Sequence, residues 1–205
     1  WGYDVQTTVL KGEDFGCLEH RDRMAMVAVS EGIDFDIESL VKPTSEPSKL
    51  GDYLEDVPAD SPLWSTMSYL REKEQRDMEA GKGFRMQICD EDASHIGTIG
   101  RGYAKCRSTE IKVQHPTDRS LLRQLTPVEH ARIKGVPEQM IAGLSITAAH
   151  EMLGQSILSK PFRALGDHIG NALVAWLHGI RLPKRDTPSL RRPAPAPLTD
   201  LPLFA

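Results

Sequence analysis

The chain has 205 residues, of which 40% are apolar and 26% charged, and its formal net charge is −4. This length and composition suit one ordinary hydrophobic core, or a core with a small additional lobe. No apolar run approaches the roughly 20 residues that span a bilayer. Three cysteines without a Cys-x-x-Cys pair argue against a disulfide scaffold or a zinc site. We therefore expect a cytoplasmic protein without membrane contact and without a bound metal.

The charge is distributed unevenly along the chain. Residues 38–80 carry five basic and ten acidic side chains, whereas residues 97–136 carry eight basic and three acidic ones. A basic segment inside an acidic chain is typical of a surface that faces phosphate groups. An ordinary solvated face is the alternative interpretation.

The first 36 residues show two strand patterns. Residues 3–10 alternate, with Tyr3, Val5, Thr7 and Val9 on one face. Residues 23–29 form a nearly continuous apolar run, which is typical of a strand covered on both faces. A polar loop separates them, so we predict two strands of one sheet.

The middle of the chain is less regular. Four prolines mark residues 42–62 as a loop, and residues 63–80 have the composition of a polar helix that ends at Gly81. Residues 81–122 read as short β-like segments and turns.

Residues 123–137 contain a complete set of helix-boundary signals. Thr126 and Glu129 have capping-box spacing, and Pro127 stands at the first helical position. Gly135 can adopt the left-handed conformation that ends a helix. The sequence therefore predicts a helix over about 126–134.

Two further helices are expected at 147–153 and about 161–178. In the second, six apolar residues recur at helical spacing and should face a core. They are Phe162, Leu165, Ile169, Leu173, Trp176 and Ile180.

Three separated blocks of sequence resemble motifs of the DNA cytosine-5 methyltransferase family. Residues 123–137 resemble the family's R-x-L-T-P-x-E-x-x-R-x-x-G-x-P segment. The triplet that begins at Gly154 resembles the G-N-S motif, with Gln155 in place of asparagine. Residues 14–28 resemble the Y/F-G-x-P-Q-x-R-x-R segment and the apolar strand that follows it. The three blocks occur in family order, and together they identify the chain as a member.

The resemblance places Arg21 and Arg23 at the target-cytosine pocket. A guanidinium suits this position because it stays protonated and offers a fixed fork of donors to carbonyl and phosphate oxygens. Leu18 and Glu19 replace the family's proline and glutamine, and a carboxylate can only accept hydrogen bonds. The role of position 19 therefore stays open. Alternatively, both arginines are loop residues that pair with Glu19 or Asp22.

The resemblance also places Gln155 and Ser156 beside the cofactor, S-adenosylmethionine. The residues alone permit a second interpretation, in which Gly154 ends one helix and Ser159 caps the next. Both interpretations can hold together.

The family carries a variable DNA-recognition region between the first two blocks, and residues 96–108 are the best candidate for it here. Glycines in this stretch allow the backbone to approach DNA closely, and its cations can reach phosphates or base edges. The predicted DNA-binding residues are Thr98, Arg101, Tyr103, Lys105 and Arg107, together with Arg123, which should also organise the recognition lobe.

The family's earlier motifs do not occur in the sequence. There is no F-x-G-x-G loop, no Glu-Asn-Val and no Pro-Cys dipeptide, so Cys17, Cys89 and Cys106 do not match the nucleophile. Cytosine-5 methylation needs a thiolate that attacks the ring. We therefore expect the chain to be the C-terminal portion of a bacterial or phage-type restriction–modification enzyme. Alone, it should be inactive. Its missing N-terminal half would bind most of the S-adenosylmethionine.

These expectations give a mixed α/β organisation. Residues 1–36 would be closing strands of a Rossmann-like methyltransferase sheet, and residues 37–122 a small irregular α+β DNA-recognition lobe. Residues 123–182 would be a connector and helices that pack back on the catalytic domain, and residues 183–205 a flexible Pro-rich tail.

The expected function is to bind duplex DNA and to help hold a flipped cytosine and S-adenosylmethionine. The alternative is a non-catalytic DNA-binding or specificity subunit of a split methyltransferase. In the tail, residues 198–204 resemble the short peptide that docks on the bacterial sliding clamp through spaced anchors. An ordinary Pro-rich tail is the competing interpretation.

Overall fold

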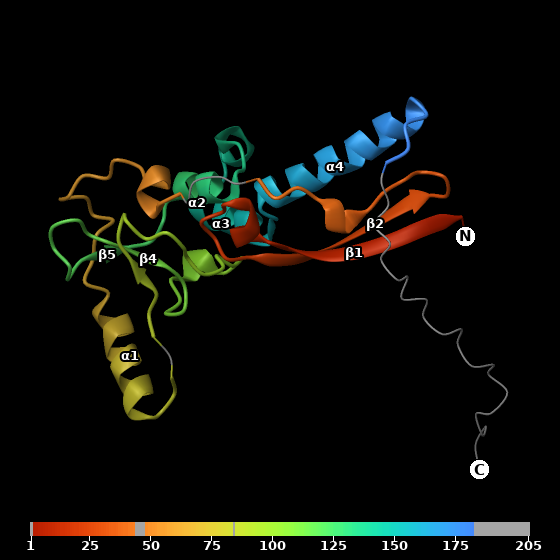
Figure 1. The fold of residues 1–205 in the computed structure, drawn as a ribbon. Helices are drawn as coiled ribbons and strands as arrows, with labels where there is room; N and C mark the ends of the chain where they lie inside the picture. Colours follow the sequence, from red (N-terminus) through yellow and green to blue (C-terminus); the bar gives the residue numbers. More distant parts are fainter. Residues whose placement is uncertain (1, 44–47, 84, 183–205) are drawn as a thin grey trace, which may run out of the picture.

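The computed structural model describes residues 2–43, 48–83 and 85–182. The predicted Pro-rich tail and its clamp-like peptide at 198–204 lie outside these residues. A two-stranded hairpin covered by a long helix forms one end of the molecule, and an irregular lobe forms the other (Figure 1). Two short helices lie between these two parts.

The hairpin consists of β1 (Tyr3–Lys11) and β2 (Asp22–Ser30), which pair antiparallel along their whole length. The short 3₁₀ helix η1 (Gly12–Phe15) begins the connection between them. The two strands predicted at 3–10 and 23–29 are confirmed. One face of the hairpin packs against α4 (Ser159–Leu177) through a common core of Leu10, Phe15, Ala25, Val27, Val29, Phe35, Ile37, Leu165 and Ala172.

The opposite face of the hairpin is apolar but uncovered. Its side chains are between 53 and 73% exposed, and they are Tyr3, Val5, Val9, Met24 and Met26. Within the described residues β2 also pairs only with β1, so its second edge is open. The sequence predicts that β2 is covered on both faces. Within the described residues only the face toward α4 is covered, so this prediction is wrong there.

Helix α4 agrees with the predicted helix at 161–178 but not with all of its predicted contacts. Phe162, Leu165 and Ile169 pack on the hairpin core as expected. Trp176 and Ile180 are 51 and 58% exposed, so their predicted core position is wrong. Leu173 is also exposed.

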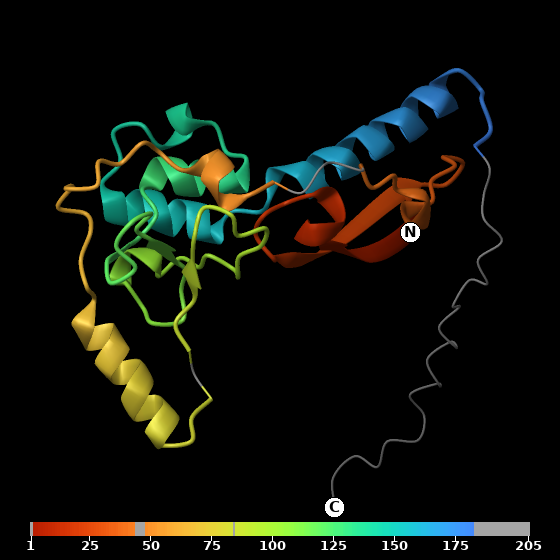
Figure 2. The same ribbon diagram turned by 60° about the vertical axis from the view of Figure 1, so that its left-hand side comes forward.

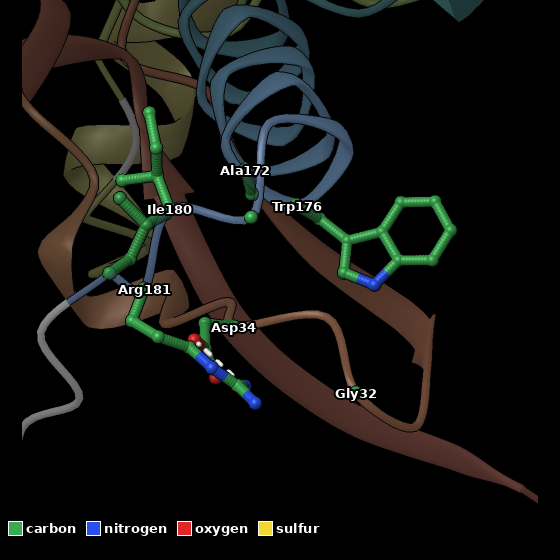
Figure 3. A pocket seen from close by; sticks show the side chains of 8 residues that line it. Gly32, Asp34, Ala172, Trp176, Ile180 and Arg181 are labelled. Carbon is green, nitrogen blue, oxygen red and sulfur yellow. Dashed lines mark hydrogen bonds and ion pairs between the residues drawn. The ribbon is translucent and has the colours of Figure 1, made fainter.

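A hollow lies beside the end of α4, and Figure 3 shows Trp176 pointing away from the helix at its margin. There Arg181 reaches across to Asp34, with 3.4 Å between Nη1 and Oδ2 (Figure 3). This ion pair joins the end of α4 to the turn after β2.

The lobe is built from short elements. They are η3 (Leu50–Tyr53), α1 (Ser68–Glu79), β3 (Ile88–Cys89), η4 (Tyr103–Lys105), β4 (Lys112–Gln114) and β5 (Leu122–Arg123). The preceding η2 (Ile37–Ser39) lies against β1 instead, where Ile37 joins the hairpin core. In the small sheet of the lobe β4 pairs parallel with β3 and antiparallel with β5. Helix α1 lies within the helix predicted at 63–80 and projects away from the rest of the lobe (Figure 2).

The lobe core draws on residues from outside the lobe. It contains Leu18 from the β1–β2 connection and Ile133 from α2 (Pro127–Lys134). The remaining buried members are Leu50, Ile96, Ile99, Tyr103, Ile111, Val113 and Leu125. The lobe is therefore packed continuously against the two blocks of sequence that flank it.

Helix α2 (Pro127–Lys134) has the predicted boundaries. Thr126 Oγ1 accepts the Glu129 N–H at 3.2 Å, and Glu129 Oε2 accepts the Thr126 N–H at 2.8 Å. Gly135 ends the helix with a φ of +68°. The capping box and the left-handed stop are confirmed.

The short η5 (Glu138–Ile141) leads into α3 (Ile146–Gln155), which is longer than the predicted 147–153. The prediction that Gly154 ends this helix is wrong, because Gly154 lies inside α3 and is buried. A Cβ at this position would lie 2.3 Å from the backbone of Gly100 and Arg101. The close approach of α3 to this turn is what requires a glycine.

No helix in the described part of the chain is both long and apolar enough to cross a membrane. The described residues also contain no group of three histidine, cysteine or carboxylate side chains arranged to hold a metal ion.

The Gly154→Ala variant is expected to lose about 1–3 kcal/mol of unfolding free energy, since its methyl group overlaps backbone that cannot move aside easily. Gly166 lies on α4 with nothing near its missing Cβ. The matched Gly166→Ala variant should be unchanged or gain up to about 1 kcal/mol from helix propensity. Urea unfolding of both variants measures the difference, and equal stabilities would contradict the close-packing explanation.

Candidate functional site

Glu19 lies at the centre of a buried polar junction between the hairpin, the lobe and α2. Its Oε1 accepts from Lys134 Nζ at 2.6 Å and from the Ile99 N–H at 3.0 Å. Neither side chain of the ion pair is exposed. Burial lowers the pKa of Lys134 to about 8, although the Glu19 carboxylate acts in the opposite direction. The open question about position 19 thus has a structural answer: its carboxylate is an internal acceptor for two donors.

The two predicted pocket arginines lie in different environments. Arg21 is buried, and its Nη2 donates to the carbonyl oxygen of Gly154 at 3.0 Å. Its Nη1 lies 3.8 Å from Glu19 Oε1. Arg23 is exposed and donates to the Asp22 carbonyl at 2.7 Å. Of the two, only Arg23 presents its side chain to solvent, while Arg21 ties the β1–β2 connection to α3.

The glycine-containing loop at 96–102 is held against the β1–β2 connection. The Ile96 N–H donates to the Leu18 carbonyl at 2.9 Å, and the Ile96 carbonyl accepts from the His20 N–H at 2.8 Å. Thr98 Oγ1 donates to the His20 carbonyl at 2.6 Å. This short parallel bridge places the predicted DNA-recognition segment directly beside the predicted cytosine-pocket segment.

The predicted DNA-contacting cations of this region are at the surface. Arg101, Lys105 and Arg107 are exposed. Arg101 pairs with Glu151 of α3, with 2.9 Å between Nη2 and Oε1. Thr98 is also exposed, although its hydroxyl is already engaged. These four residues remain predicted DNA contacts.

The predicted DNA contact of Tyr103 is wrong, because its side chain is fully buried. Its hydroxyl donates to the Ile111 carbonyl at 3.0 Å and accepts the Leu125 N–H at 2.8 Å. Burial raises the pKa of this phenol. Tyr103 is therefore a hydrogen-bonded core residue of the lobe.

The predicted DNA contact of Arg123 is wrong for the same reason. Its guanidinium is buried and forms two hydrogen bonds of 2.7 Å to the Glu129 carboxylate. The guanidinium also lies over the Trp64 ring, 5.0 Å from the ring centroid. In addition, the Glu129 carboxylate accepts the Glu55 N–H at 2.8 Å. These contacts join β5 to α2 and to the loop at 54–64, which fits the other predicted role of Arg123, that of organising the lobe.

The residues predicted to lie beside the cofactor form the end of α3. The Ser156 hydroxyl donates to the Leu153 carbonyl at 2.7 Å, so it satisfies a backbone acceptor at the end of α3. Gln155 is exposed and free to reach outward. Leu158 rather than Ser159 is the N-cap of α4, so the predicted cap is wrong by one residue. A role of Gln155 and Ser156 toward S-adenosylmethionine stays a prediction.

A buried histidine pair was not predicted. His130 of α2 and His150 of α3 face each other with 3.0 Å between their Nδ1 atoms. Their rings lie beside Tyr103, with centroid distances of 5.7 and 5.0 Å. Burial lowers the pKa of His130 to about 2 and that of His150 to about 4. Both rings are therefore neutral at pH 7, with one Nδ1–H donating to the other Nδ1.

Solved structures with similar folds define the class of this domain. Schizosaccharomyces pombe Dnmt2 methyltransferase superposes with a TM-score of 0.69 at 21% identity, over 84% of this chain and 59% of that chain. Entamoeba histolytica methyltransferase EhMeth superposes with a TM-score of 0.64 at 17% identity, over 84% of this chain and 55% of that chain. The mixed α/β architecture is accordingly that of a Rossmann-like methyltransferase fold, as predicted.

Sequence comparison then identifies the family. The model for C-5 cytosine-specific DNA methylases matches residues 1–171, and the chain belongs to this family. The type II methyltransferase M.NlaX of Neisseria lactamica is 31% identical over 180 residues, which are 85% of this chain and 55% of that enzyme. M1.ScrFI of Lactococcus lactis subsp. cremoris is 29% identical, over 80% of this chain and 43% of that enzyme. The chain thus spans about half the length of these relatives.

The histidine pair predicts a loss of stability in mild acid. Both folded-state pKa values lie below the ordinary value of about 6.5, so the unfolded chain takes up protons first as the pH falls. The two neutral rings therefore make their full contribution to the unfolding free energy above about pH 6.5, and this contribution declines at lower pH. Between pH 7 and pH 5 the unfolding free energy should fall by about 2 kcal/mol or more.

Urea unfolding at the two pH values measures this decline. A His130→Leu/His150→Leu variant serves as the comparison, because it removes both titrating rings. The same pH dependence in this variant and in the natural sequence would show that other groups cause the decline.

Proposed function

We propose that this chain is the C-terminal portion of a DNA (cytosine-5) methyltransferase and that it works together with a catalytic half. In this role it binds duplex DNA and helps to hold the flipped cytosine and S-adenosylmethionine. The observation that carries the proposal is the half-covered hairpin formed by β1 and β2.

Strands of a Rossmann-like sheet are normally covered by helices on both faces. Here α4 covers one face of the hairpin, while the other presents a continuous apolar surface that includes Met24 and Met26. Beside the open edge of β2 runs a groove lined by β2 and by residues of α4, among them Phe162 and Ile169. An apolar sheet face beside an unpaired edge suits the addition of further strands and a covering helix. A catalytic half would supply both.

The cysteines of the chain support the need for a second half. Cys17, Cys89 and Cys106 are free thiols, and none of them follows a proline. Burial raises the pKa of Cys17 and of Cys89, which disfavours the thiolate that cytosine attack requires. In the proposed enzyme the nucleophile comes from the other half, and this chain alone transfers no methyl group.

The exposed side chains near the junction give the proposed DNA surface. Arg101, Lys105 and Arg107 would contact phosphates or base edges, and Arg23 would reach the flipped base. Gln155, at the exposed end of α3, would lie nearest to S-adenosylmethionine. The same contacts are needed whether the two halves belong to one polypeptide or to two.

The Met26→Lys variant should lose association with the catalytic half encoded upstream, by at least about tenfold, because a charge would be buried on the apolar sheet face. Its own stability should be unchanged, since Met26 is 66% exposed. Met78→Lys on α1, where the methionine is also exposed, is the matched control and should bind normally.

Sedimentation of the two polypeptides, alone and mixed, measures this association. Equal binding by both variants would contradict the proposed contact surface. An upstream reading frame without a Pro-Cys motif would contradict the proposed function.

A further inference from the structure

We propose that Glu19 and Lys134 act together as positioning residues, which hold the DNA-facing loop at 96–102 in a set register against the cytosine-pocket segment at 21–23. This inference deepens the proposed function and rests on it for the roles of the loop and the segment.

The two side chains hold both backbone polar groups of one residue. Glu19 Oε1 accepts the Ile99 N–H at 3.0 Å, and Lys134 Nζ donates to the Ile99 carbonyl at 3.4 Å. Lys134 Nζ also donates to Glu19 Oε1 at 2.6 Å, so the two side chains bind each other as well as Ile99. Ile99 is itself buried in the lobe core. The backbone of the loop is therefore fixed at Ile99, two residues before the exposed Arg101.

The other end of the arrangement is the predicted cytosine-pocket segment. Gly100 and Arg101 pack directly on Gly154, where even a Cβ would overlap them. The Gly154 carbonyl accepts a hydrogen bond from Arg21, whose Nη1 lies 3.8 Å from Glu19. A closed ring of contacts thus runs from Glu19 through the loop and α3 to Arg21 and back to Glu19. A shift of the loop would therefore disturb the contacts of Arg21, which lies two residues before Arg23.

The charges of the pair matter separately from its geometry. A glutamine, which the family has at the position of Glu19, could still accept the Ile99 N–H through its carbonyl oxygen. It could not balance the buried ammonium of Lys134, and a buried charge without its partner is strongly unfavourable. The two positions are therefore expected to tolerate joint neutralisation better than the loss of either charge alone.

Three variants separate these effects. Glu19→Gln keeps an acceptor for Ile99 but leaves Lys134 without an anion, whereas Glu19→Gln/Lys134→Gln keeps the acceptor and removes both charges. Glu138→Gln is the matched control, because it breaks an exposed ion pair with Arg132 of α2, the helix that also carries Lys134.

Hydrogen exchange of the full chain tests the positioning role directly. In Glu19→Gln, exchange at 96–102 should accelerate at least tenfold while β1 and β2 stay protected. The double variant should return to within about threefold of the natural sequence, and Glu138→Gln should not change. Uniform acceleration across the chain, or a double variant no better than Glu19→Gln, would overturn the proposal.

Duplex DNA affinity of the same proteins at low salt connects this role to function. Glu19→Gln should weaken binding about tenfold, and the double variant should recover most of it. Accelerated loop exchange without any change in affinity would overturn the link between the loop position and DNA contact. Absence of duplex binding by the natural sequence would instead contradict the proposed function, while the exchange result would still decide the positioning role.

Discussion

The buried Glu19–Lys134 ion pair is the contact at which the separate parts of this domain meet. Glu19 belongs to the connection between β1 and β2, Lys134 to the end of α2, and Ile99, which both side chains bind, to the lobe. Burying two charges is expensive unless each finds its partner and its hydrogen bonds. Correct formation of this pair therefore requires the hairpin connection, α2 and the loop at 96–102 to be in place together.

A second constraint is the unequal covering of the hairpin. Its α4 face is a closed apolar core, while the opposite face exposes side chains such as Met24 and Met26. Large exposed apolar surfaces are uncommon on isolated domains and mark interaction sites. The chain spans about half the length of the relatives that it matches, and its sequence contains no Pro-Cys dipeptide. The proposed second half would cover this face of the hairpin.

Sequence patterns predicted the parts of the fold whose causes are local. The capping residues around α2, the alternation in β1 and the apolar spacing in the first half of α4 all act between near neighbours along the chain. These features needed no knowledge of distant contacts. The first family block contains Glu19 and Arg21, but the motif did not predict their buried contacts with Lys134, Ile99 and Gly154.

The errors have non-local causes. Tyr103 and Arg123 have the side chains of DNA-binding residues, but residue type does not report burial, and both complete the lobe core. The need for glycine at position 154 comes from a turn more than fifty residues earlier. His130 and His150 are twenty residues apart and share no periodic pattern. Each of these positions is decided by packing between elements, which a single sequence does not specify.

We propose that this chain completes a cytosine-5 methyltransferase whose nucleophile lies in another half. Transfer of labelled methyl groups from S-adenosylmethionine to duplex DNA tests it most directly, with the chain alone, the upstream-encoded half alone, and the two combined. We expect 5-methylcytosine only in the combination. Methylation by this chain alone, or by the other half at an undiminished rate without it, would show that this chain does not complete the enzyme in this way.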